Sequence, residues 1–228
     1  METSPVRRQI LDAFVRKSNL KQRIFDNTFA AMNLLKETLL EMASEMDDQL
    51  DGRLDRHVRL EYRDRGKFEA QLQIADDLLI FQMHTDVFRF PDDHPVHRNP
   101  YVIRDEENGY CGVVNIYNFL SDSFKYNRNA DEGYLIGRLF INRDRRYFVE
   151  GKGQESLRAD RFGSEELDRE ALIAVLEAAI DFSLRFDLLM PPFDHNKRVT
   201  VDQFNTRMDN SKFVTGKRLG YDFDVEDI

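Results

Sequence analysis

The sequence contains no tryptophan and a single cysteine, Cys111, among its 228 residues. One cysteine excludes an internal disulfide and a zinc site built from clustered cysteines, which is typical of a reducing compartment. The longest apolar run, residues 171–180, is broken by Glu177 and is much shorter than the ~20 residues that a membrane-spanning helix needs. The first residues mix acidic and basic side chains, unlike a secretory signal. We therefore expect a soluble, cytoplasmic protein that does not associate with a membrane.

Familiar catalytic and nucleotide-binding motifs are also missing. The chain has no G-x-x-x-x-G-K-[ST] loop, no G-x-G-x-x-G turn, no G-x-S-x-G nucleophile elbow and no H-E-x-x-H pattern. Their absence argues against the P-loop, dinucleotide-binding, α/β-hydrolase and zincin classes. No other motif leads us to recognise a family.

The charge balance argues against a nucleic-acid partner. With 42 acidic and 33 basic residues the chain has a formal net charge of −9, which opposes the phosphate backbone of DNA or RNA. Hydrophobic residues make up 41% of the chain and charged residues 33%, a balance typical of globular proteins. A core rich in phenylalanine is expected, since there are 18 of them.

Residues 5–51 have a helical pattern, which we interpret as two helices divided near Ser18 and Asn19, because either residue can cap a helix. In the second helix, apolar residues recur every three or four positions and form a stripe about 45 Å long. The stripe consists of Leu20, Ile24, Thr28, Met32, Leu35, Leu39, Met42, Met46 and Leu50.

This apolar stripe is longer than a sheet is wide, since six strands span only about 24 Å. The excess requires a second surface, and three are possible: the same helix of a second copy, another protein, or the first helix folded back with Ile10, Leu11 and Phe14. The candidate interface residues are Leu35, Leu39, Met42 and Met46.

From residue 52 the apolar period changes from 3.6 to 2, which indicates β-strands. Short turn sequences separate the strands, so we expect antiparallel hairpins. A long loop containing proline and histidine, residues 91–109, interrupts the series. The six expected strands cover residues 58–62, 68–74, 78–90, 112–119, 134–141 and 145–151.

A further apolar helix is predicted from Ser164, a good N-cap, to about Leu188. The predicted fold class is α+β, with about six mostly antiparallel strands packed against N-terminal helices and this one long helix of the C-terminal half. We expect one domain with three parts: an N-terminal helical segment (1–51), the sheet with its packing helix (52–190) and a C-terminal wrap or tail (191–228).

Four residues in and before the long loop are candidate metal ligands. Imidazoles and carboxylates bind Zn²⁺, Mn²⁺ or Fe²⁺, and side chains two positions apart on a strand point to one face. The alternative is a solvated loop in which the first histidine is a partly buried, hydrogen-bonded strand residue. The candidates are His84, Asp86, His94 and His97.

An E-x-K pattern, Glu150 to Lys152, ends an apolar strand. One class of metal-dependent nucleases holds Mg²⁺ with such a glutamate and a neighbouring aspartate, while the lysine stabilises developing charge. Asp86 is the candidate aspartate. The 64 positions between Asp86 and Glu150 argue against this site, and the alternative is an exposed Glu and Lys at a strand end.

Two functional hypotheses follow. The first is a non-enzymatic acidic protein without a cofactor that acts through protein–protein interaction or regulation, with another protein or with itself as an oligomer. The second is a nuclease-like, metal-dependent hydrolase that uses a divalent metal with Asp86, Glu150 and Lys152 or with the His/Asp loop. The missing catalytic motifs and the long apolar stripe favour the first.

Overall fold

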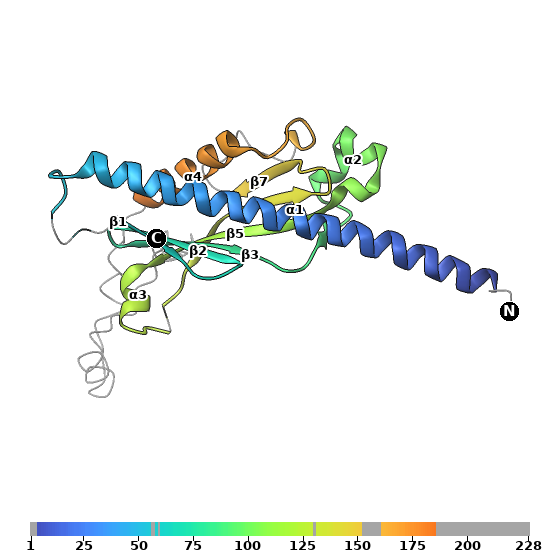
Figure 1. The fold of residues 1–228 in the computed structure, drawn as a ribbon, viewed down its shortest axis with the longest axis horizontal. Coiled ribbons are helices and arrows are strands. Elements are labelled where there is room, and N and C mark those ends of the chain that lie inside the picture. The colour runs from blue at the N-terminus through green and yellow to red at the C-terminus, as the bar shows by residue number, and fades with distance from the viewer. Residues whose placement is uncertain (1–3, 56–57, 59, 130, 152–160, 186–228) are drawn as a thin grey trace, which may run out of the picture.

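The computed structural model describes residues 4–55, 58, 60–129, 131–151 and 161–185. They form an antiparallel sheet with two long helices and several short helical segments (Figure 1), which confirms the α+β class. The strands are β1 (Leu60–Asp64), β2 (Glu69–Ile74), β3 (Asp77–Met83), β4 (Phe88–Arg89), β5 (Tyr110–Leu120), β6 (Tyr134–Asn142) and β7 (Tyr147–Gly151). The helical elements are α1 (Pro5–Leu50), η1 (Pro95–Arg98), α2 (Pro100–Arg104), η2 (Glu106–Gly109), α3 (Ser121–Lys125) and α4 (Arg169–Leu184).

The sheet has the order β1-β2-β3-β5-β6-β7, with every neighbouring pair antiparallel. The strand expected over 78–90 is divided, because the chain leaves the ladder after Met83 and returns as β4, where Phe88 pairs with Cys111 of β5. Between these strands the amide of Asp86 donates a hydrogen bond to His84 Nδ1, at 3.0 Å. The interruption adds a seventh, very short strand to the six expected.

Helix α1 is one continuous helix of 46 residues, and the expected division at Ser18 and Asn19 is wrong. No glycine or proline lies between Pro5 and Gly52 to break it, and a residue that can cap a helix is also tolerated inside one. The helix begins where Pro5 occupies its first turn and the side chain of Ser4 accepts a hydrogen bond from the amide of Arg7.

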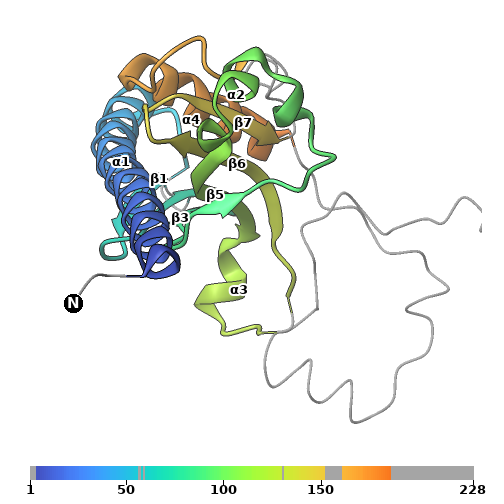
Figure 2. The same ribbon diagram turned by 90° about the vertical axis from the view of Figure 1, so that its right-hand side faces the viewer.

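Helices α1 and α4 pack side by side on one face of the sheet (Figures 1 and 2). Their apolar residues share a single core with the inward-facing residues of the central strands. Leu35 and Leu39 are fully buried in this core, which corrects their expected place at an interface: the protein's own sheet covers them. Met42 and Met46 are partly buried against the same core.

A second, smaller core lies on the opposite face of the sheet. Alternation along β5, β6 and β7 points Val113, Phe140 and Phe148 to this face. The segment expected as an open loop, 91–109, folds into η1, α2 and η2 and covers them. Its residues Val96 and Val102 are almost fully buried there, so the segment is an ordered cap.

Helix α4 begins at Arg169 and is capped by Asp168, whose side chain accepts a hydrogen bond from the amide of Ala171 at 2.8 Å. The expected start at Ser164 is wrong, because Glu166 forms a β-bridge with Arg146 and keeps this stretch extended. As expected, the helix packs on the sheet. The expected helix end near Leu188 and the C-terminal segment 191–228 lie outside the described residues.

Candidate functional site

The four candidate metal ligands do not converge. His84 and Asp86 lie together, with 3.9 Å between Nδ1 and a carboxylate oxygen, but both side chains are exposed. His97 lies in η1, where its Nε2 is 3.2 Å from the carbonyl oxygen of Phe90. His94 caps the same short helix through a hydrogen bond that its Nδ1 accepts from the amide of Val96. Each of the three imidazoles therefore contacts backbone atoms close to it in the sequence.

His94 also meets Glu150, which joins residues from two separate predictions. Its Nε2 lies 2.8 Å from one oxygen of Glu150, and the guanidinium of Arg138 lies 2.8 Å from the other. The ring of Phe90 stacks on His94, with 4.5 Å between the ring centroids. Because both carboxylate oxygens are engaged, Glu150 ties the η1 segment to β6 and β7.

The nuclease-like constellation does not assemble in the part of the chain that the structure describes. No group of three or more His, Cys, Asp or Glu side chains there is arranged to hold a metal ion. Lys152 lies outside the described residues. Cys111 is buried, and desolvation raises the pKa of its thiol, so it is a core residue rather than a nucleophile.

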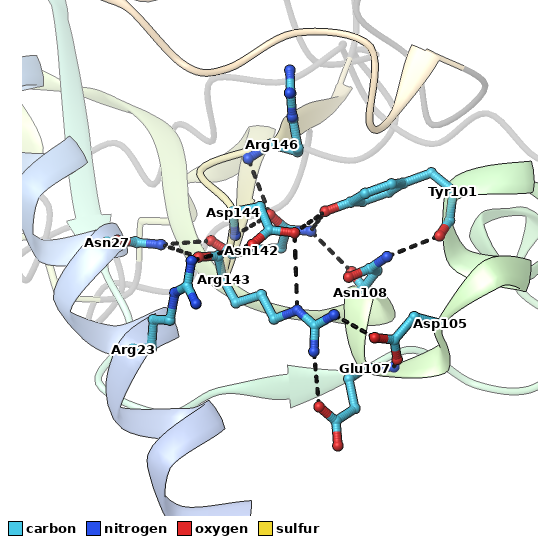
Figure 3. Close-up of polar contacts among 10 residues, drawn as sticks. All are labelled: Arg23, Asn27, Tyr101, Asp105, Glu107, Asn108, Asn142, Arg143, Asp144 and Arg146. Atoms are coloured by element: carbon cyan, nitrogen blue, oxygen red, sulfur yellow. Dashed lines mark hydrogen bonds and ion pairs between the residues drawn. The ribbon is translucent and has the colours of Figure 1, made fainter. Parts of the chain in front are cut away.

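The most connected polar cluster surrounds the β6–β7 turn, residues 143–146 (Figure 3). The fully buried side chain of Asn142 organises it: its oxygen accepts hydrogen bonds from the amides of Asp144 and Arg146, both at 3.0 Å. Its nitrogen donates to the hydroxyl of Tyr101 and to a backbone carbonyl of η2. Arg145 adopts a left-handed φ of 59°, which a non-glycine residue holds only when its surroundings impose it.

Helix α1 is attached to this turn by polar contacts. The side-chain nitrogen of Asn27 donates to the carbonyl oxygens of Asn142 and Arg143, at 3.1 and 2.8 Å. The guanidinium of Arg23 lies 3.3 Å from the carboxylate of Asp144, which also accepts a hydrogen bond from the Tyr101 hydroxyl at 2.8 Å. The turn therefore fixes the helix where it leaves the sheet.

The cap contributes carboxylates to the same network. Arg143 pairs with Asp105 and, at 2.8 Å, with Glu107. The hydrogen bond from Arg143, followed by the one from the backbone amide of Glu107, holds the pKa of Asp105 below its usual value. Glu107 also forms an ion pair with Arg16 of α1, with 3.4 Å between Nε and a carboxylate oxygen. Arg16 is thus the last residue toward the N-terminus whose side chain forms an ion pair with the body within the described residues.

A shallow pocket beside the turn is strongly basic, although the chain as a whole is acidic. Four of its arginines already hold carboxylates or backbone carbonyls of the protein, so the arrangement fastens α1, the cap and the segment before α4 to the β6–β7 turn. The pocket is lined by Arg23, Arg104, Arg143, Arg145 and Arg146, against the carboxylates of Asp144 and Glu166.

Toward its N-terminus α1 projects from the body, with Arg16 as an ion-pair contact near the base of the projecting part (Figure 1). We call residues 5–19 of α1 the arm; all of them are exposed, over a length of about 22 Å. Val6, Ile10 and Phe14 precede the buried Ile24, Thr28 and Met32 by 18 residues, which is five helical turns, so they continue the buried face of α1 past the edge of the sheet. Its large apolar side chains are Val6 (64% exposed), Ile10 (62%), Leu11 (51%), Phe14 (68%) and Val15 (55%).

Comparisons with known proteins do not identify a function for the chain. No family model, curated protein or solved structure matches the chain. Among the described residues, no helix combines the length and the apolarity needed to cross a membrane.

The sequence contains a signal for the arm. Ile10, Leu11 and Phe14 are apolar, but a helix break at Ser18 would fold them back onto the stripe. Without that break, the apolar stripe extends from Val6 through Leu39, and its excess over the sheet falls at the N-terminal end. The polar cluster around the β6–β7 turn has only a weak signal in the sequence, because a run of arginines usually lies on the solvated surface.

Proposed function

We propose that the protein is a non-enzymatic interaction protein and that the arm of α1 is its docking element. The observation that carries this is the apolar face of the arm: five large side chains, each more than half exposed, project beyond the body. An isolated helix of about 15 residues is marginal in water, and an apolar face gains stability only when a second surface covers it.

The attachment of α1 supports the same role. Asn27, Arg23 and Arg16 bind the β6–β7 turn and the cap, so the direction of the arm is set by the body. A helix held in one direction loses less entropy when a partner binds it than a flexible segment does. Amphipathic helices are a common recognition element, with anchors at spacings of three and four residues, as in Ile10, Phe14 and Leu11.

Site-specific photo-crosslinking in the cell of origin tests this function, because it captures whichever protein contacts the arm. A photoreactive phenylalanine analogue replaces Phe14 of the arm or, as the control, Phe124 of α3, which is 49% exposed. We expect a discrete covalent adduct from position 14 and none from position 124. No adduct from position 14, or the same adducts from both positions, would overturn the proposal.

A further inference from the structure

The charged residues of α1 are distributed in the order that the helix dipole disfavours. Residues 5–25 include six basic side chains and one acidic, whereas residues 26–50 include one basic and six acidic. The helix macrodipole favours the reverse arrangement, with acidic groups near the N-terminus and basic groups near the C-terminus. The first turn has no acidic residue and the last turn no basic residue. The charge pattern therefore weakens α1 as an isolated helix.

Partners within the chain account for part of this pattern. Arg16 and Arg23 in the first half pair with the cap and the turn, and Lys36 and Glu41 in the second pair with Asp64 and Arg169. Several exposed charges make no ion pair with another described residue. On the basic side they are Arg7, Arg8, Lys17 and Lys21, and on the acidic side Asp12, Asp26, Glu37, Glu45, Asp47 and Asp48, of which the last three lie together near the C-terminal end.

We infer that α1 pairs antiparallel with α1 of a second copy, so that the basic arm of each lies along the acidic end of the other. The inference rests on the proposed function, because it names the partner of the arm. An antiparallel pair places opposite charges and opposite dipole ends together at both ends of the seam. A parallel pair would place Arg7 and Arg8 beside their own copies.

Exposed apolar residues follow the same seam. Leu40 is 52% exposed in the acidic half, although the preceding residue, Leu39, lies in the core. Leu40 follows Leu11 by 29 residues, or about eight turns, and therefore lies on the same side of α1. Val15 lies beside Leu11 on that side. In the antiparallel pair, Leu11 and Val15 of one copy meet Leu40 of the other.

A charge swap tests this pairing. One variant carries Arg7→Glu and Arg8→Glu, and the other carries Asp47→Lys and Asp48→Lys. All four residues are exposed and the new charges suit the macrodipole, so both variants keep their fold. The matched controls reverse exposed charges outside α1, with Arg65→Glu and Arg98→Glu in one and Asp93→Lys and Glu132→Lys in the other.

Sedimentation equilibrium at low salt should give a wild-type dimer, twice the 26.9 kDa of one chain. Each α1 variant alone should dimerise at least about tenfold more weakly, because repulsion replaces attraction at both ends of the seam. An equimolar mixture of the two variants should recover the dimer, and the controls should match wild type. A dimer that both variants retain, or a mixture that stays monomeric, overturns the antiparallel pairing.

The result also separates this inference from the proposed function. A wild-type monomer at every concentration overturns self-association. If position 14 still gives an adduct, whose mass then identifies another protein, the docking role of the arm stands. If neither a dimer nor an adduct forms, both fail.

Discussion

Leu39 is fully buried against the sheet, whereas Leu40, the next residue of α1, exposes 52% of its surface. One residue turns a helix by about 100°, which is enough to move a side chain from the core to the outer face. The two leucines thus serve as matched probes of the two faces of α1, with the same chemistry in adjacent positions.

We predict that Leu39→Ala lowers the free energy of unfolding by about 2–5 kcal/mol, because it leaves a cavity in the core. Leu40→Ala should change it by less than about 0.5 kcal/mol in dilute solution while weakening the dimer. Chemical denaturation measures the first effect and sedimentation the second. Equal losses of unfolding free energy in the two variants would contradict the placement of Leu39 in the core and Leu40 on the outer face.

Asn142 offers a test of the turn network. Asn142→Ala removes two acceptor and two donor contacts inside the protein, and we predict a loss of about 2–4 kcal/mol in unfolding free energy. Asn129→Ala, at an exposed position, is the control and should cost less than about 0.5 kcal/mol. Similar values for both variants would show that the buried amide does not organise the turn.

Tyr101 gives the network a signature at alkaline pH. Burial, followed by the hydrogen bond to Asp144, raises the pKa of its phenol from 10.0 to about 12, although the hydrogen bond from Asn142 acts in the opposite direction. The unfolded chain then loses this proton at lower pH than the folded chain. The resulting stability is complete below about pH 10 and is lost as the pH rises through about 12.

We therefore predict that the unfolding free energy falls more steeply between about pH 10 and 12 in the wild type than in Tyr101→Phe. Denaturant titrations at a series of pH values measure both slopes. The absorbance of tyrosinate should also lose one late-titrating group in the variant. Superimposable pH profiles would mean that the phenol is not held neutral by the fold.

The charges of the arm make a prediction that runs against simple helix design. Because Arg7 and Arg8 oppose the macrodipole, Arg7→Glu with Arg8→Glu should stabilise the helical form of the monomeric arm by about 0.3–1 kcal/mol for each residue at low salt and so raise its helicity. Circular dichroism on dilute protein measures this, with the neutral Arg7→Gln and Arg8→Gln variant expected between the two. A loss of helicity would show that these arginines stabilise the helix within one chain.

Much of the fold is predictable because its signals are local. Alternation identifies the strands, and the stripe from Leu20 identifies the buried face of α1. The split after Met83 and the late start of α4 at Arg169 are not predictable. Each depends on a pairing partner elsewhere in the chain. The strand β4 pairs with β5, and Glu166, which precedes α4, pairs with Arg146.

The candidate site is less accessible to sequence reasoning. Ser18 and Asn19 resemble helix caps, and only the tertiary structure shows that α1 continues through them. The contact between His94 and Glu150 joins residues 56 positions apart, so no local pattern marks it. The charge division along α1, in contrast, is visible in the sequence once the helix is known to be continuous.

Hydrogen exchange of the arm at several protein concentrations tests the central claim most directly. We predict that amides of residues 5–19 exchange rapidly in dilute wild-type protein and become protected as the concentration rises, while those of Leu20 to Ala43 stay protected throughout. Rapid exchange of the arm at every concentration would contradict its pairing with a second copy. Protection that equals that of the buried segment at every concentration would contradict the projecting arm itself.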